Sequence, residues 1–189
     1  MKHVVVTPAG RRRYMELLVP HVLREQKSLD EYRIWVNTTD KNDLDYLHSL
    51  EMQHRGFITL DQSAHGQKNI GSNFSICNFY KNCTDINTIY TRIDDDIVWL
   101  EPGFFNKLYK FRIKNPKYFL VFANIINNSI LDHIHSRMGC FKELNPKKIG
   151  YDCMDKTGWG DVDACFVRHE CFIKDVKTNN FKKYKFSKW

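Results

Sequence analysis

The sequence predicts an α/β protein in which a mostly parallel central sheet is flanked by helices. Along the first half of the chain, apolar runs of strand length alternate with segments of helical periodicity, which is the order that produces a parallel sheet. The length of 189 residues suits one domain with a substantial core. Hydrophobic residues make up 42% of the chain and charged residues 27%, which is typical of a globular protein. We therefore expect a single domain over residues 1–189, which a longer protein could contain as one part.

The first half of the chain predicts the order strand, helix, strand, helix, strand. The expected strands cover residues 4–6, 32–36 and 57–60, and the expected helices cover residues 14–23 and 44–50. The segment Thr-Pro-Ala-Gly at 7–10 is expected to end the first strand. The expected apolar faces of the helices are Leu17, Leu18 and Val22, and then Leu44, Leu47 and Leu50. Because crossovers between parallel strands are right-handed, the strand ends gather at one edge, where such sheets bind ligands.

The second half of the chain predicts further helices and strands. A helix is expected over 74–80, a strand over 88–93 and another strand over 118–123. Pro102 suits the first turn of a helix with Phe104 and Phe105 on its buried side. The last expected elements are a helix over 130–138 capped by Asn128 or Ser129, a helix that includes 164–167, and a closing strand with a solvated lysine face within 174–189.

Three consecutive carboxylates, Asp94, Asp95 and Asp96, follow the strand expected over 88–93. Adjacent negative charges repel one another, so a fold that gathers them is unfavourable unless a cation neutralises them. Mg2+ and Mn2+ are the ions that prefer carboxylate oxygens. The triplet therefore predicts a divalent metal site at the end of a strand, with a solvated turn or a helix cap as the alternative.

The segment over 92–98, Arg-Ile-Asp-Asp-Asp-Ile-Val, resembles the DxD segment of GT-A glycosyltransferases, the enzymes that transfer a sugar from a nucleotide donor. The whole chain also resembles the small GT-A domains found in multi-domain glycosyltransferases of large algal viruses and in bacterial polysaccharide clusters. The resemblance implies a GT-A-like domain with a Rossmann-like nucleotide-sugar-binding half over about 1–96 and an acceptor and catalytic half over about 97–189. It also implies a UDP-sugar donor, Mn2+ or Mg2+ as cofactor, and a carbohydrate or glycoprotein acceptor.

By this resemblance, Asp96 is the direct metal ligand, Asp94 ligates the metal or holds the ribose, and Asp95 supports one of these roles. In the family, the loop after the first strand contacts the base and ribose, and arginines in this loop could reach the diphosphate. Residues 65–73 form a polar segment before a helix, where a phosphate could bind, although an ordinary solvated loop is the alternative. The residues expected to bind the nucleotide-sugar are Thr7, Pro8, Ala9, Arg11, Arg13, Asn37, Lys68, Asp94 and Asp95.

The segment Gly-Trp-Gly-Asp-Val-Asp at 158–163 resembles the Gly-Trp-Gly-acidic loop of several GT-A families. Its two acids are separated by a valine, so either Asp163 or Asp161 could be the catalytic carboxylate, and ungapped counting from the tryptophan favours Asp163. As an alternative, Asp161 caps the helix that follows. The weaker candidates are His169 as a further metal ligand, and Asn127 and Trp159 as acceptor contacts.

Charge, cysteine spacing and the length of apolar runs restrict the classes of protein to which the chain can belong. The formal net charge of +7 suits an anionic partner such as a nucleotide, a nucleic acid or a phospholipid. The six cysteines form no Cys-x-x-Cys pair, which argues against a zinc ribbon or a thiol redox motif. No apolar run approaches the ~20 residues of a membrane span, and the N-terminus has no signal-peptide pattern. We expect a cytoplasmic protein, in the host cytoplasm if the chain is viral.

Two other functions stay open. A metal-dependent nucleotidyltransferase also combines an α/β sheet, acidic residues and a nucleotide. It would be favoured by a glycine-rich basic loop after the first strand, which residues 7–13 partly imitate with a single glycine. A nucleic-acid-binding module without catalysis would explain the basic charge and the lysine- and aromatic-rich end of the chain. A carboxylate triplet, however, would repel phosphates unless it held a metal.

Overall fold

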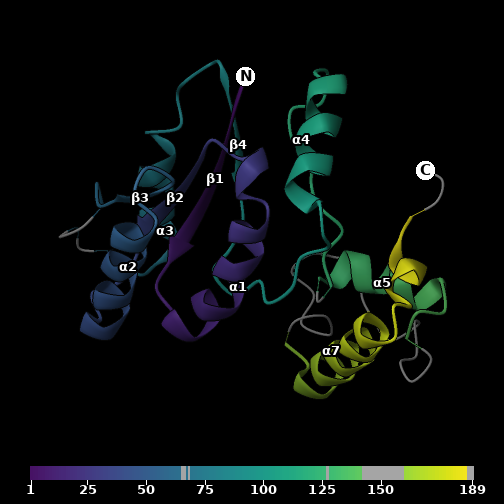
Figure 1. Cartoon of the computed structure of the whole chain (residues 1–189). Coiled ribbons are helices and arrows are strands. Elements are labelled where there is room, and N and C mark those ends of the chain that lie inside the picture. Colours follow the sequence, from purple (N-terminus) through teal and green to yellow (C-terminus); the bar gives the residue numbers. More distant parts are fainter. Residues whose placement is uncertain (65–66, 68, 127, 142–159, 187–189) are drawn as a thin grey trace. The chain divides into compact units, whose positions relative to one another are not determined.

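The structure is a computed structural model that describes residues 1–64, 67, 69–126, 128–141 and 160–186 (Figure 1). The chain divides into two compact units, Met1–Val121 and Phe122–Trp189, which we call unit 1 and unit 2. Unit 1 contains the sheet, and the described part of unit 2 is helical. Across the described residues no helix is long and apolar enough to cross a bilayer. The prediction of a single domain whose halves meet near residue 96 stays a prediction.

Unit 1 is built on a four-stranded sheet in which all strands are parallel and the order is β3-β2-β1-β4. The strands are β1 (Lys2–Ala9), β2 (Glu31–Val36), β3 (Ile58–Asp61) and β4 (Thr88–Arg92). β1 lies in the interior of the sheet, so Val6 pairs with Arg33 of β2 on one side and with Arg92 of β4 on the other. The predicted α/β class with a parallel sheet flanked by helices is therefore confirmed.

Helices cover both faces of the sheet because its strands carry apolar side chains on both sides. They are α1 (Arg12–Arg24), η1 (Gln26–Ser28), α2 (Lys41–Gln53), α3 (Asn73–Tyr80) and α4 (Phe104–Lys114). One core cluster joins Val5 of β1 to side chains of α1, α2 and α4. The other joins Val4 and Val6, which alternate with Val5 and so point to the opposite face, to Ile76 and Phe79 of α3.

The buried face of α1 differs in part from the predicted one. Met15, Leu18, Val19 and Val22 are buried, at the spacing that places side chains on one side of a helix. Leu17, which we expected on this face, is 51% exposed because it lies one residue, or about 100° around the helix, from Leu18.

The first strand is longer than predicted. Thr7, Pro8 and Ala9 continue the pairing with β2 instead of ending the strand. Proline has no N–H for the sheet, but the pairing of β1 with β4 runs only as far as Val6, so Pro8 has a strand on one side rather than two. The extension carries Gly10 to the carboxyl edge of the sheet.

The described helices of unit 2 are α5 (Ser129–Arg137), α7 (Val162–Lys177) and η2 (Phe181–Tyr184). α5 is capped as predicted, because the side chain of Asn128 accepts a hydrogen bond from the backbone N–H of Leu131 at 3.3 Å. A small apolar core forms around Phe141 and Tyr184.

A buried ion pair joins α5 to α7. The Oδ2 atom of Asp132 lies 3.0 Å from Nε of Arg168, and both side chains are fully buried. Removing two charges from water is costly, and their attraction offsets that cost only while both partners are present. The pair therefore fixes the position of one helix against the other.

Two predicted strands are not formed. Residues 118–123 pair with no strand in the described part of the chain, and Phe119 among them is 91% exposed. The run has the composition of a strand, but a strand also needs a neighbour, and composition does not supply one. The closing strand predicted within 174–189 is wrong as well, because the described part of this range, 174–186, contains the end of α7 and η2 and no strand. The lysines that we placed on a strand face include two in the last turn of α7, where positive charge suits the helix dipole.

Candidate functional site

A cleft of about 940 Å³ opens in unit 1 at the carboxyl edge of the sheet. β1 has β2 on one side and β4 on the other, and the cleft lies at the carboxyl ends of these strands, where parallel sheets bind ligands. Among the described residues, the charged lining of this cleft consists of Arg11, Arg12, Arg13, Arg92, Asp40, Asp43, Asp94, Asp95 and Asp96. The loops after β1, β2 and β4 thus bring charges of both signs to one place.

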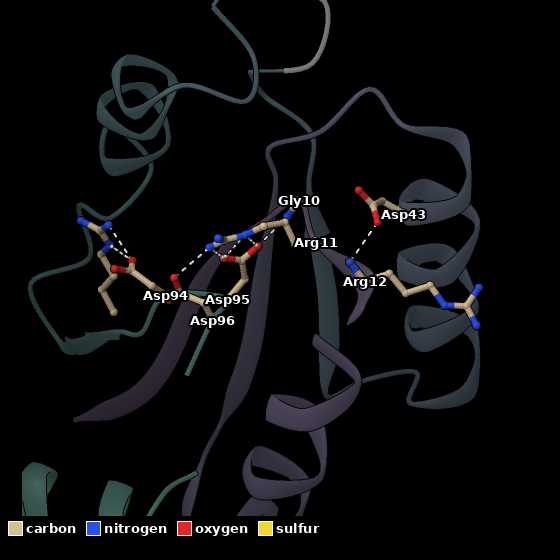
Figure 2. Close-up of polar contacts among 8 residues, drawn as sticks. Gly10, Arg11, Arg12, Asp43, Asp94, Asp95 and Asp96 are labelled. Atoms are coloured by element: carbon tan, nitrogen blue, oxygen red, sulfur yellow. Dashed lines mark hydrogen bonds and ion pairs between the residues drawn. The ribbon is translucent and has the colours of Figure 1, made fainter. Parts of the chain in front are cut away.

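Asp95 is the buried member of the acidic triplet, with 4% of its surface exposed. Its Oδ2 atom accepts a hydrogen bond from the backbone N–H of Gly10 at 3.1 Å (Figure 2). Arg11 donates from Nε to both carboxylate oxygens at 3.2 Å, and its Nη2 atom forms an ion pair with Oδ1. Asp95 therefore ties the loop after β1 to the end of β4.

Arg11 also reaches the next aspartate. Its Nη2 atom lies 3.1 Å from Oδ2 of Asp96, and the side chains of both residues are 47% exposed. The guanidinium lies 5.1 Å from the ring centroid of Tyr14, within cation–π range. The hydrogen bond to Asp95 raises the pKa of Arg11 further above its ordinary value, against the lowering effect of burial, so Arg11 stays charged at any physiological pH.

Asp94 is paired with a different arginine. Its Oδ1 atom lies 2.7 Å from Nη2 of Arg92, and the Asp94 side chain is 53% exposed. Arg92 donates a further hydrogen bond to the hydroxyl of Tyr80 at 3.3 Å. Burial lowers the pKa of Arg92, but the bond to Tyr80 and the charge of Asp94 outweigh it, so the net shift is upward. Each aspartate of the triplet therefore has an arginine as counter-cation.

The opposite wall of the cleft is held by Asn37 and Asp43. Oδ1 of Asn37 accepts a hydrogen bond from the backbone N–H of Gly71 at 2.9 Å, which ties the start of α3 to the end of β2. Asp43, in the first turn of α2, accepts from the backbone N–H of Arg12 at 2.9 Å and from the hydroxyl of Thr38 at 3.1 Å. These bonds join the starts of α1, α2 and α3 into one rim.

The donor chemistry of the cleft fits a hard divalent ion with an anionic partner. In the described part of the chain, no group of three or more His, Cys, Asp or Glu side chains is arranged to hold a metal by itself. Mg2+ and similar ions, however, are commonly held by one or two carboxylates together with substrate phosphates. Asp94 and Asp96 are the exposed carboxylates of this kind, and the guanidinium of Arg11 already places positive charge beside Asp96. The residues thus fit a metal that a bound anion helps to hold.

The structure gathers part of the predicted nucleotide-sugar site. Pro8, Arg11, Arg13 and Asn37 line the cleft with the acidic triplet. Thr7 and Ala9 belong to β1 and are fully buried; the hydroxyl of Thr7 accepts a hydrogen bond from Tyr32 at 3.1 Å in the core. The guanidinium of Arg13 lies 4.7 Å from the ring centroid of Tyr14. Lys68, Asn127 and Trp159 lie outside the described residues.

The predicted acids of the second half lie in unit 2. The side chain of Asp161 caps α7 by accepting a hydrogen bond from the backbone N–H of Ala164 at 3.0 Å. Asp163 is exposed in the first turn of the same helix. His169 is an exposed residue of α7, and partial burial of its ring, followed by the charge of Arg168, lowers its pKa. Capping, which we held as the alternative for Asp161, is therefore its role in the structure.

Sequence reasoning did not select Asp43 and Arg92, which both take part in the cleft. Arg92 is the last residue of β4, directly before the triplet, so its position at the same edge follows from the predicted strand. Asp43 stands three residues after Asp40, the residue whose side chain caps α2. Carboxylates in the first turn of a helix at this edge are a signal that would have found it.

Comparisons with known proteins return no match: no family model, no curated protein and no solved structure is detectably similar to this chain. The fold and the cleft define an α/β protein with a charged cleft at the carboxyl edge of a parallel sheet.

Proposed function

We propose that this protein is a divalent-metal-dependent glycosyltransferase that moves a sugar from a UDP donor to a hydroxyl group of a glycan or glycoprotein acceptor. The observation that carries the proposal is the position of the acidic triplet. Asp94, Asp95 and Asp96 leave the end of β4 beside arginines, in a cleft at the edge where parallel sheets bind nucleotides. The resemblance of 92–98 to a DxD segment supports the same reaction.

Asp96, with Asp94 beside it, would hold Mn2+ or Mg2+ through carboxylate oxygens. When bound, the ion would offset the negative charge that develops on the diphosphate as the sugar–phosphate bond breaks. Arg11 and Arg13 would bind phosphate oxygens, since a guanidinium donates paired hydrogen bonds to such groups. All four side chains line the same cleft, which supports a shared role.

Asp163 is the better candidate for the carboxylate that acts on the acceptor. It is exposed, whereas the side chain of Asp161 is engaged in capping α7. In an inverting reaction, the acceptor oxygen forms its bond to the anomeric carbon as UDP leaves, and Asp163 takes the hydroxyl proton. In a retaining reaction, the same carboxylate would orient the acceptor.

A second candidate function is metal-dependent nucleotidyl transfer. It is favoured by the segment from Gly10 to Arg13, which follows β1 directly, runs into the first turn of α1 and lines the cleft with three arginines. Backbone and basic groups at this position of an α/β sheet suit a triphosphate as well as a diphosphate. The two candidates therefore differ in the nucleotide that the cleft prefers.

The test titrates UDP, CTP and a short oligonucleotide into the protein by calorimetry, with Mn2+ and with a chelator. We expect UDP to bind only with Mn2+, and Asp96→Asn to weaken this binding at least about tenfold, which corresponds to about 1.4 kcal/mol. Asp45→Asn is the matched control, because Asp45 is an exposed aspartate of α2 outside the cleft lining. It should leave UDP binding unchanged.

Other outcomes would redirect the proposal. Mn2+-dependent binding of CTP in preference to UDP would favour nucleotidyl transfer. Salt-sensitive oligonucleotide binding that ignores Asp96→Asn would favour a nucleic-acid-binding module. If UDP binds equally well with the chelator, the metal has no part in the site. If UDP binding does require Mn2+, hydrolysis of a panel of nucleotide-sugars would identify the donor.

A further inference from the structure

Arg11 is the cation that neutralises Asp96 in this structure (Figure 2). The same guanidinium is bonded to Asp95 through Nε and Nη2. The Asp95 side chain is 6% exposed, whereas that of Asp96 is 47% exposed. Arg11 therefore has one buried partner, Asp95, and one partner that is exposed in the cleft, Asp96.

The buried contact is the anchor of Arg11. Asp95 itself accepts a hydrogen bond from the backbone N–H of Gly10 at 3.1 Å. Its carboxylate is therefore expected to keep its position when a ligand enters the cleft. A guanidinium has five N–H donors, and the bonds to Asp95 leave others for a second acceptor. The contact with Asp96 can thus open while Arg11 stays attached to Asp95, and Arg11 can then donate to a phosphate oxygen.

Arg11 and a divalent ion compete for the same carboxylate. Two cations on Asp96 would repel one another at a separation of a few ångströms, where Coulomb energies are large even near a protein surface. An anionic diphosphate in the cleft changes this balance, because it offers Arg11 another partner. Over the described residues the lining has five aspartates and four arginines, so its own charges nearly balance. A divalent cation that enters together with an anionic diphosphate disturbs this balance less than either ligand alone.

We propose that Arg11 is an exchangeable counter-cation, which neutralises Asp96 in the free protein and turns to the diphosphate when a divalent ion takes Asp96. The inference rests on the proposed function, from which it takes the metal and the diphosphate. Metal binding releases Arg11 for the diphosphate, and the diphosphate draws Arg11 from Asp96. The two ligands therefore bind cooperatively, and by linkage each strengthens the other by the same factor.

The test is a set of calorimetric titrations on the full chain: Mn2+ with and without saturating UDP, and UDP with and without Mn2+. In the unsubstituted protein, each ligand should tighten the other at least about tenfold. In Arg11→Gln, Mn2+ alone should bind about 3- to 10-fold more tightly because its competitor is gone. The mutual enhancement should fall at least about threefold, to the part that direct contact between the ion and the diphosphate supplies. Arg55→Gln removes the same charge at an exposed site outside the cleft lining and should keep the full enhancement.

A second variant separates binding from folding. Arg11→Gln alone leaves the buried carboxylate of Asp95 without its guanidinium, which destabilises a protein strongly. The double variant Arg11→Gln/Asp95→Asn removes both charges, and the amide oxygen can still accept from Gly10. Thermal unfolding of each variant is recorded, and the double variant should show the same loss of mutual enhancement with a higher melting temperature than Arg11→Gln.

Three results would overturn the inference or its basis in different ways. If both variants keep the full enhancement, Arg11 does not exchange, although the proposed function stands. If UDP weakens in them but Mn2+ alone binds no more tightly, Arg11 is only a phosphate ligand and the exchange is wrong. If the unsubstituted protein binds no Mn2+, or binds it equally after Asp96→Asn, the proposed function itself fails, whatever Arg11 does.

Discussion

At the scale of single residues, Gly10 is a position in the cleft lining where the backbone of a neighbouring strand end leaves no room for a side chain. A Cβ atom added there would lie 2.9 Å from the backbone oxygen of Asn37, closer than real Cβ atoms approach. Gly10→Ala must therefore push the loop after β1 away from β2, at a cost of about 1–3 kcal/mol in the free energy of unfolding. Urea denaturation measures this cost. The shift should also lengthen the hydrogen bond from the Gly10 N–H to Asp95 and weaken UDP binding.

Gly56→Ala provides the comparison for this prediction. A Cβ atom at Gly56 would meet nothing within 4 Å, although its φ of 82° makes alanine unfavourable there by about 1 kcal/mol. It should reduce stability without changing UDP binding. A Gly10→Ala protein as stable as the unsubstituted one would show that the two loops are not held as close as the structure has them.

The sequence predicted which residue types gather at this site, but not which of the three aspartates is buried and which are exposed. The rule that strand ends meet at one edge correctly gathered Pro8, Arg11 and Asn37 around the triplet. It did not reveal that Asp95 is buried while Asp94 and Asp96 are about half exposed. That difference depends on the loop after β1, which is distant in sequence and reaches Asp95 only in the folded chain.

At the scale of secondary-structure elements, the ion pair between Asp132 and Arg168 should carry much of the stability of unit 2. Asp132→Asn removes the carboxylate charge that lies 3.0 Å from Nε of the fully buried Arg168. We expect a loss of about 3–5 kcal/mol, because removing one partner of a buried ion pair is strongly destabilising. Thermal or urea unfolding, followed by near-ultraviolet circular dichroism, measures it.

Replacing both partners tests the cause of this loss. Asp132→Leu/Arg168→Met removes both charges and should recover most of the stability, since apolar groups of similar volume often replace a buried pair at little cost. If the double variant is as unstable as Asp132→Asn, packing rather than charge explains the effect.

The helices were easier to predict than the last strands. α5 and α7 are capped by Asn128 and Asp161, whose side chains accept hydrogen bonds from backbone N–H groups in the first turn, a signal that is local in sequence. Residues 118–123 have a strand-like composition, but whether a strand forms depends on a partner elsewhere in the chain. Local signals were therefore sufficient for helix starts and insufficient for strand pairing.

At the scale of the whole molecule, His3 of unit 1 and His135 of unit 2 are the histidines that are almost fully buried among the described residues. Burial lowers the pKa of His3 in unit 1 and of His135 in unit 2 to about 4, from an ordinary value of 6.5. As the pH falls below about 6.5, the unfolded chain takes up protons at these sites while the folded chain does not, so stability falls until about pH 4. Each histidine contributes a slope of up to about 1.4 kcal/mol per pH unit.

Unfolding free energies measured across this range test the prediction. His3→Gln can preserve the hydrogen bond to Thr91, which His3 makes through Nε2 at 2.9 Å, and should flatten the dependence of unit 1 on pH. His135→Phe can keep the contacts with Phe141 and Tyr184 and should do the same for unit 2. If neither substitution changes the slope, carboxylates alone account for the acid sensitivity.

The interior position of β1 also orders the events of synthesis. β1, β2 and β3 can pair as soon as Asp61 has left the ribosome, but the second edge of β1 must wait for β4. Gly10 and Asp95, which are 85 positions apart, meet only at that point. A nascent chain halted before Thr88 would therefore carry three paired strands, an uncovered hydrogen-bonding edge on Val4 to Val6, and none of the acidic wall of the cleft.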